Sequence, residues 1–209
     1  MDHLSKARRV IQMEIEELEN LLNRIDEKFS QAINVLKTTI DAGHKFVVIG
    51  VGKCHNIGHK IAATLNSTGA PAVVLNSQNA LHGDLGIVSN GDTVLALSYS
   101  GETNEILDLL PALRRFKINL ISMTGNTDSS LGRNSDIILN TKVNREACPL
   151  NLAPTSSTTA MLVLGDALAM TLLESRGFVK EDFAKLHPGG SLGRTLLTKV
   201  SDIMRTGDK

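Results

Sequence analysis

Residues 46–58 read FVVIGVGKCHNIG, an apolar run followed by glycines and then by a helical pattern. A strand, a glycine-rich turn and a helix in this order often place a phosphorylated ligand at the turn. Strands that are apolar throughout and alternate with helices predict a five-stranded parallel sheet in a three-layer α/β/α sandwich. The apolar runs rich in β-branched residues are 46–50, 72–75, 93–98, 119–124 and 136–140.

Helical patterns account for most of the remaining chain. The N-terminal segment 1–42 carries apolar residues at steps of three and four from Ile11 to Ile40, which predicts helix with one apolar stripe. That stripe either packs on its own domain or forms a seam with another subunit. The other expected helices are 56–69, 102–116, about 127–134 and a nearly all-apolar, central helix at about 157–176.

Length, charge and cysteine content limit the class of protein. The 209 residues suit one well-buried domain with appendages, and 22 basic residues balance 22 acidic ones. A formal net charge of zero gives no field that would favour nucleic acid or an anionic membrane. No apolar run reaches the roughly 18 residues needed to cross a bilayer, and the two cysteines form no CxxC pair. We expect a cytoplasmic protein without nucleic-acid or membrane partners.

The opening glycine loop does not fit a nucleotide. A Walker A loop requires a Ser or Thr after Gly52-Lys53, where this chain has Cys54, and a glycine at position 47, where it has valine. A dinucleotide fingerprint requires glycine at position 55, which is histidine, and an acidic residue after the second strand, where 72–79 has none. ATP and NAD are therefore disfavoured.

The third strand ends in SYSGETNE, residues 98–105. The hydroxyls of Ser98, Ser100 and Thr103 surround Gly101 at the start of an expected helix. Hydroxyls, free backbone N–H groups and the positive end of a helix together suit a single phosphate monoester. An ordinary helix cap by Ser100 would explain one of these hydroxyls but not three.

This strand–SxSGET–helix unit resembles the signature of the SIS (sugar isomerase) domain. Longer motifs over about residues 45–208 resemble the arabinose 5-phosphate isomerase family, and they include 50–69, 82–86, 100–105, 145–160 and 181–194. The resemblance implies a flavodoxin-like fold, no organic cofactor and a homotetramer. It also implies interconversion of D-ribulose 5-phosphate and D-arabinose 5-phosphate through an enediol, feeding Kdo synthesis for lipopolysaccharide or capsule.

Such a reaction needs a base to move a proton between C1 and C2, a donor or cation for the oxyanion, and a phosphate cradle. The candidate catalytic residues that match the family motifs are Lys53, His82, Glu105, Glu146 and His187. The candidate substrate and phosphate ligands are Gly52, Lys53, Ser98, Ser100, Gly101, Thr103, Ser156 and Ser157.

Several roles within this set stay open. We expect a carboxylate to move the proton and His187 to help open the sugar ring. Glu146 is a candidate base, or it forms an ion pair with Arg145 or Lys142. The resemblance implies that either histidine can act across a subunit interface. Ser156-Ser157 can cap the long helix and also line the sugar site.

The chain departs from the family pattern in places. Cys54-His55 replaces the usual Ser-Gly, and Asn79 stands where a glutamate is usual. His55 and His59 are spaced to share a metal ion, but a third and fourth ligand are not evident, so no metal site is expected.

The expected organisation is a helical segment at 1–42, an SIS domain at 43–198 and a tail at 199–209. The tail corresponds to the start of the CBS-domain pair found in many family members. The chain is either a natural form without that pair or an excised catalytic domain.

Two alternatives to this function remain. One is an SIS isomerase of another sugar phosphate. The other is a non-catalytic phosphosugar sensor, for which we would expect a helix-turn-helix and a basic patch that this sequence lacks.

Overall fold

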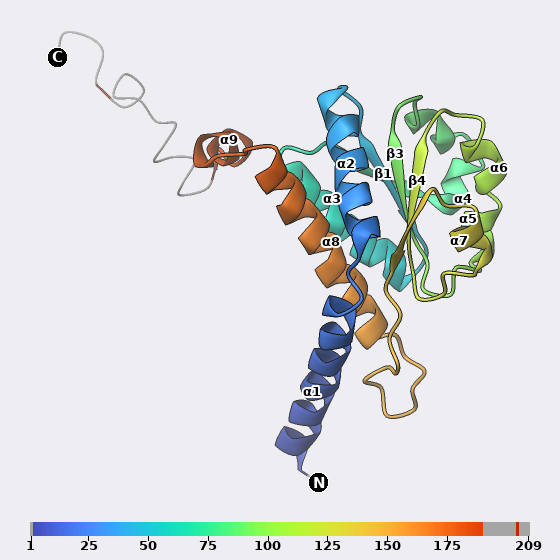
Figure 1. Cartoon of the computed structure of the whole chain (residues 1–209), viewed down its shortest axis with the longest axis vertical. Coiled ribbons are helices and arrows are strands. Elements are labelled where there is room, and N and C mark those ends of the chain that lie inside the picture. Colours follow the sequence, from blue (N-terminus) through green and yellow to red (C-terminus); the bar gives the residue numbers. More distant parts are fainter. Residues whose placement is uncertain (1, 190–203, 205–209) are drawn as a thin grey trace.

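The computed structural model describes residues 2–189 and 204. Its centre is a parallel sheet in the order β2-β1-β3-β4-β5 (Figure 1). The order reverses between β1 and β3, and open α/β sheets bind ligands at such a switch point. The predicted five-stranded α/β sandwich is confirmed. The strands are β1 Phe46–Gly50, β2 Ala72–Asn76, β3 Thr93–Leu97, β4 Asn119–Thr124 and β5 Ile137–Asn140.

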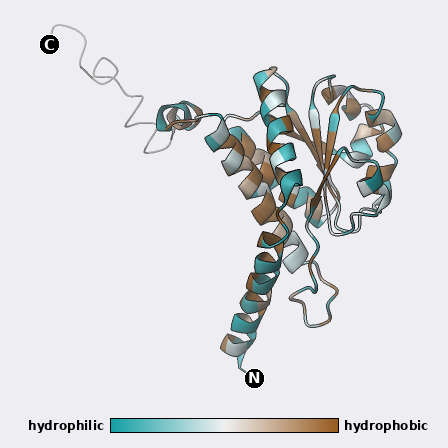
Figure 2. Cartoon of the chain, viewed as in Figure 1, coloured by the Kyte–Doolittle hydropathy of each residue, from teal (hydrophilic) through white to brown (hydrophobic). Residues whose placement is uncertain are grey.

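Helices cover both faces of the sheet (Figure 1). One face carries α2 (Glu27–Asp41), α3 (Lys53–Ser67) and α8 (Ser156–Ser175), and the other carries α4 (Ser77–Ala80), α5 (Asn104–Leu107), α6 (Leu110–Leu113) and α7 (Ser130–Arg133). Successive side chains of a strand point to opposite faces. Phe46 and Val48 therefore enter one core and Val47 and Ile49 the other, and the apolar strands lie between the two helical layers in Figure 2.

The helices of the second layer are shorter than predicted. The expected helix over 102–116 is split into α5 and α6, and the one over 127–134 is reduced to α7. Pro111 explains the split, because proline lacks an N–H and its ring would clash with the carbonyl of Leu107 in a continuous helix. Pro111 instead occupies the first turn of α6, where proline is tolerated.

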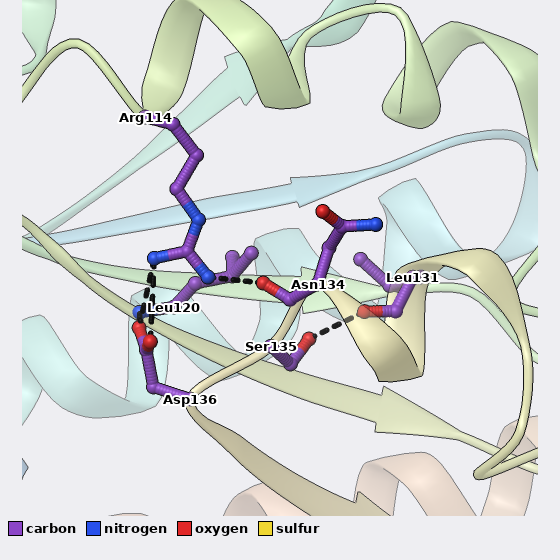
Figure 3. Close-up of polar contacts among 6 residues, drawn as sticks. All are labelled: Arg114, Leu120, Leu131, Asn134, Ser135 and Asp136. Atoms are coloured by element: carbon purple, nitrogen blue, oxygen red, sulfur yellow. Dashed lines mark hydrogen bonds and ion pairs between the residues drawn. The ribbon is translucent and has the colours of Figure 1, made fainter.

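Arg114 holds this layer to the sheet (Figure 3). Its guanidinium lies 3.3 Å from both carboxylate oxygens of Asp136 and also donates to the carbonyl of Asn134. Asp136 in turn accepts the backbone N–H of Leu120 at 2.6 Å. The contact links the end of α6 to β4 and to the start of β5, and it adds to the packing of the buried Leu109 and Leu113 against this face of the sheet.

The N-terminal stripe is divided between two helices. α1 (His3–Leu22) ends at Asn23, and Asp26 caps α2 by accepting the N–H of Lys28 at 2.9 Å. α2 packs on the core, whereas α1 extends away from the sheet beside one end of α8 (Figure 1). Ile11 and Leu22 on α1 are 59% and 72% exposed. Part of the stripe therefore serves its own domain, and part of it is uncovered.

The central helix α8 is confirmed as a core element. Ala160, Met161, Leu164 and Leu168 are buried in it. It is the one helix in the described residues that is long and apolar enough to span a membrane, but half of its apolar window is buried inside the fold.

The chain after α8 turns to the amino-terminal edge of the sheet. Arg176 donates to the carbonyl of Gly69 at 2.8 Å, and Gly69 precedes β2. A further helix, α9 (Lys180–Leu186), follows and was not predicted. The expected tail at 199–209 lies outside the described residues apart from Met204.

Candidate functional site

Two loops begin side by side at the switch point. Gly50 at the end of β1 is paired in register with Leu97 at the end of β3. The chain continues from Gly50 into Lys53 and from Leu97 into the Ser98–Thr103 loop. The two stretches that the sequence singled out therefore lie at neighbouring positions on the carboxyl edge of the sheet.

The first of these loops ends in an uncapped helix. Gly52 is the N-cap of α3 with φ +59, a left-handed conformation suited to glycine, and no side chain of the described residues caps it. A Cβ on Gly50 would lie 2.8 Å from the carbonyl carbon of Cys54, so this position requires glycine. The first-turn N–H groups of the 15-residue α3 point toward the edge of the sheet, where they can bind an anion.

Lys53 is the first residue of α3 and is exposed, with its side chain available at this edge. Cys54 is half-buried, and its Sγ lies 3.8 Å from Sδ of Met161 in α8. Burial raises the pKa of Cys54, which keeps the thiol protonated at neutral pH. The cysteine at this departure from the family pattern thus packs against the core rather than serving as a nucleophile.

The second loop is organised by its own hydroxyls. Ser98 Oγ lies 2.8 Å from Thr103 Oγ1 and accepts the N–H of Gly101 at 3.0 Å, while Ser100 Oγ accepts the N–H of Glu102 at 3.2 Å. Ser98 is buried, whereas Ser100 is exposed. Ser98 therefore shapes the loop, and Ser100 is the hydroxyl best placed to meet a ligand.

The helix that follows this loop differs from the expectation. α5 has four residues and begins at Asn104, and its N-cap Thr103 makes no side-chain capping bond within the described residues. A helix of four residues has only a small macrodipole, so the positive helix end that the sequence pattern predicted after this loop is weak. The longer α3 supplies the helix end at this edge.

The second loop is also fixed to α7. Gly101 has φ +68, and a Cβ there would lie 1.9 Å from Ser129 Oγ. The carboxylate of Glu102 accepts the N–H of Ser130 at 2.7 Å, a bond that lowers the pKa of Glu102. Leu131 donates its N–H to the carbonyl of Gly101 at 3.0 Å.

Tyr99 has a structural role that the sequence pattern does not indicate. Its hydroxyl accepts the N–H of Val143 at 3.1 Å and donates to the carbonyl of Val143 at 3.3 Å. A Cβ on Gly125 would lie 2.4 Å from the Tyr99 ring, so glycine leaves room for it. Tyr99 therefore links the second loop to the segment after β5, and both line a cavity of about 300 Å³ with Arg145 and Glu146.

Glu146 caps the start of α8. Its carboxylate accepts the N–H of Thr155 at 2.7 Å, the hydroxyl of Thr155 at 3.1 Å, the N–H of Ser157 at 3.2 Å and the hydroxyl of Ser157 at 2.5 Å. Burial raises the pKa of Glu146, but the hydrogen bonds from Ser157 and Thr155 outweigh it, and the net pKa is lowered. No ion pair with Arg145 or Lys142 forms among the described residues.

Ser156 and Ser157, which the sequence offered as a cap or as sugar ligands, take different places. Ser157 bonds Glu146, as described above. Ser156 Oγ is buried at the start of α8 and has no hydrogen-bond partner within the described part of the chain.

Glu105 and His82 also lie on the carboxyl side. Glu105 is half-buried on α5 after β3, and His82 is exposed between α4 and the short 3-10 helix η1 (Asp84–Ile87) after β2. A cavity of about 520 Å³ at this edge is lined by His55, His59, Asn79 and Asp84, among others.

The histidines His55 and His59 contact each other on α3. Their Nε2 atoms lie 3.0 Å apart and their rings meet edge to face. No group of three or more His, Cys, Asp or Glu residues that could hold a metal ion is found in residues 2–189.

His187 lies at the opposite edge of the sheet from the other four candidate catalytic residues. It follows α9, where its ring stacks on Phe183 and its Nδ1 lies 2.8 Å from the Phe183 carbonyl. The 20-residue α8, about 30 Å long, runs from the Glu146 cap to this end of the molecule. The expected single polar set therefore does not form within one chain.

The chain is similar to known proteins over nearly its whole length. A family model described as the SIS domain matches residues 40–171. The chain is 51% identical over 208 residues to the arabinose 5-phosphate isomerase KdsD of Pseudomonas aeruginosa and 52% identical over 207 residues to that of Yersinia pestis. These matches cover 100% and 99% of this chain but 63% and 62% of the two relatives.

One of the solved structures that resemble this chain is matched over its full length. It is an Escherichia coli CFT073 protein in complex with arabinose 5-phosphate, with a TM-score of 0.85 and 38% sequence identity. The match covers 90% of this chain and 100% of that chain.

Proposed function

This chain belongs to the SIS domain family, and we propose on that premise that it interconverts D-ribulose 5-phosphate and D-arabinose 5-phosphate. The reaction is an aldose–ketose isomerisation through an enediol, and we expect the enzyme to need no organic cofactor for it. We place the enzyme in the cytoplasm, with its product feeding Kdo synthesis for lipopolysaccharide or capsule.

The likeness to the Escherichia coli CFT073 protein in complex with arabinose 5-phosphate carries the proposal. It covers 100% of that chain, so the part of this chain that aligns with it corresponds to the whole of a chain that holds this sugar phosphate. The KdsD relatives are longer than this chain and support the same substrate class.

We assign the phosphate to the switch point between β1 and β3. The uncapped N–H groups of α3, the exposed Lys53 and the exposed hydroxyl of Ser100 are donors that converge on this edge from the two loops. Gly52 and Gly101 let the backbone approach the phosphate, and Ser98 and Thr103 keep the second loop in shape. Lys53 can also balance negative charge on the enediolate.

We assign the proton transfer to a carboxylate, with Glu105 favoured over Glu146. Glu105 is half-buried and forms no hydrogen bond among the described residues, so its oxygens are free to accept a proton. The carboxylate of Glu146 is already held by four donors, and its lowered pKa makes it a weaker base. Unchanged turnover in Glu146→Gln would remove Glu146 from the candidates for the base.

We propose that His187 acts in the site of another subunit of a homotetramer. Its place at the far edge of the sheet leaves it outside its own chain's carboxyl edge. The exposed apolar residues of α1 and α8, such as Ile11, Leu22 and Val163, provide surface for contacts between copies. His82 stays at the carboxyl edge, where it can assist ring opening.

Turnover of ribulose 5-phosphate tests the function. We expect the purified chain to form arabinose 5-phosphate, detected by chromatography against the two standards. Lys53→Met should raise KM, whereas Lys117→Met, the same change at an exposed position of the opposite edge, should leave turnover unchanged.

The alternative functions give different results in the same experiment. Stabilisation of the chain by arabinose 5-phosphate without turnover would favour the non-catalytic sensor. Turnover of a different sugar phosphate would favour another SIS isomerase. The absence of both turnover and stabilisation would contradict the proposed substrate.

A further inference from the structure

Glu17 is a buried carboxylate on a helix that is otherwise mostly exposed. It is 4% exposed, and Leu21 is the other buried residue of α1. Removing a carboxylate from water is costly unless hydrogen bonds replace its hydration. The burial of Glu17 therefore indicates a specific set of donors.

Those donors are two consecutive backbone N–H groups after β5. Glu17 Oε2 accepts the N–H of Asn144 at 2.9 Å, and Glu17 Oε1 accepts the N–H of Arg145 at 3.2 Å. Asn20 Nδ2, one turn further along α1, adds a bond at 3.3 Å. The two carboxylate oxygens thus hold adjacent peptide groups, an arrangement that one neutral acceptor atom cannot reproduce.

The held peptides lead directly into Glu146. The next two N–H groups, of Glu146 and Ala147, donate to Asn151 Oδ1 at 2.7 Å and to Thr155 Oγ1 at 2.8 Å. Both acceptors belong to the same irregular segment before α8, so they constrain its internal shape. Glu17 instead fixes that segment to a helix 127 residues earlier in the sequence.

We propose that Glu17 is a positioning residue for the segment that carries Arg145 and Glu146. By clamping the N–H groups of Asn144 and Arg145, it sets where both side chains enter the cavity shared with Tyr99. The proposal rests on the proposed function, because it takes this segment to be part of the isomerase site. α1 then has a role in the site as well as any role between subunits.

Glu17→Gln is the decisive variant because it preserves the shape of the side chain. Its amide offers one oxygen acceptor, and its NH₂ group would face the second backbone N–H. Glu19→Gln is the matched control, since Glu19 is exposed on the same helix. Far-UV circular dichroism and urea unfolding of each full-length variant establish that the fold is retained.

Two measurements read out positioning. Amide hydrogen exchange should accelerate roughly tenfold or more at Asn144 and Arg145 in Glu17→Gln, as expected for loss of bonds to a charged acceptor. With ribulose 5-phosphate, kcat should fall at least about tenfold while KM changes by less than about threefold, because a shift of Arg145 and Glu146 alters the cavity that orients the sugar and leaves the phosphate donors of the β1–β3 edge in place. Glu19→Gln should match the wild type in both.

Each contrary result is informative. Unchanged exchange at Asn144 and Arg145 would overturn the clamp, and faster exchange with kcat within twofold of the wild type would overturn the positioning role. If the wild type shows no isomerase activity, the proposed function is contradicted. Amide exchange at Glu146 and Ala147 then decides alone whether Glu17 positions the segment. Faster exchange there in Glu17→Gln supports the positioning role, and wild-type exchange there refutes it.

Discussion

Glu146→Ala should destabilise the protein strongly because it removes the cap of its central helix. The variant deletes the acceptor of four hydrogen bonds, two from Thr155 and two from Ser157. Ser157 is buried, so water cannot easily replace the lost carboxylate. α8 packs against α1, α2 and α3, so loss of its cap weakens a helix that contacts all three.

The size of the effect follows from the hydrogen bonds. A bond to a charged group is worth about 1.5–3 kcal/mol, and a lost helix cap costs about 1 kcal/mol. Because the four bonds share one carboxylate they do not add fully, and we expect a loss of about 3 kcal/mol in the free energy of unfolding. For a chain of this length that corresponds to a decrease in Tm of roughly 6–12 °C.

The control is Glu102→Ala, which removes an exposed carboxylate with one acceptor bond, to Ser130. Its expected cost is small, because water replaces the lost hydrogen bond of an exposed carboxylate. Urea unfolding of both variants at one fixed chain concentration measures the difference and avoids effects of subunit association. A Glu146→Ala variant no less stable than Glu102→Ala would refute the capping argument.

The pH dependence gives an independent check on Glu146. Its folded-state pKa lies below the ordinary 4.5, so the ionised carboxylate favours the folded state. The stabilisation is fully present above pH 4.5 and is lost as the pH falls through the lower folded-state pKa. The stability gap between wild type and Glu146→Ala should therefore narrow below pH 4.5, and a gap that widens there would contradict the assignment.

Three further predictions concern packing and the site. Gly165→Ala should destabilise the protein, since its Cβ would lie 2.4 Å from Ile61 Cδ1, and adding Ile61→Val should recover part of the loss in urea unfolding. Gly101→Ala should lower Tm and raise KM for the sugar phosphate, because φ +68 and a tight contact disfavour any side chain there. Lys53→Met and His187→Ala chains should each be impaired alone at a substrate concentration near the wild-type KM. Mixed oligomers of the two should regain activity after subunit exchange if His187 acts across an interface, and no recovery would contradict it.

The sheet could be predicted because buried parallel strands have a strong composition signal. Each apolar run, from the first at 46–50 to the last at 136–140, became a strand. The observed strand bounds differ from the predicted ones by at most one residue. The short helices of the second layer could not be predicted, because the amphipathic pattern continues through Pro111 whereas a continuous helix cannot. α9 was missed because seven residues give too short a periodic signal.

The position of the candidate site could be predicted from the sequence, but the long-range hydrogen bonds that connect its segments could not. The rule that ligands bind at the carboxyl ends of parallel strands placed Lys53 and the Ser98–Thr103 loop at one edge. The contacts of Tyr99 with Val143 and of Glu17 with Asn144 join residues 44 and 127 positions apart. One sequence read by periodicity carries no signal for such pairs, and a glutamate in an acidic helix looks like any solvated one.

These long-range contacts explain how a site built on irregular backbone can be stiff. The segment from Thr141 to Thr155 contains no helix or strand, so its peptide groups must find other partners. Several of them bond side chains: Tyr99 of the Ser98–Thr103 loop, Glu17 of α1 and Thr155 at the start of α8. Because Tyr99 and Glu17 bond the consecutive N–H groups of Val143 and Asn144, a shift of the Ser98–Thr103 loop would be transmitted through Tyr99 to the residues just before Glu146. Under the proposed function, binding of the phosphate and placement of Glu146 would be coupled through this segment, and an isomerase needs such coupling to fix C1 and C2 while the phosphate is held at the other end of the sugar.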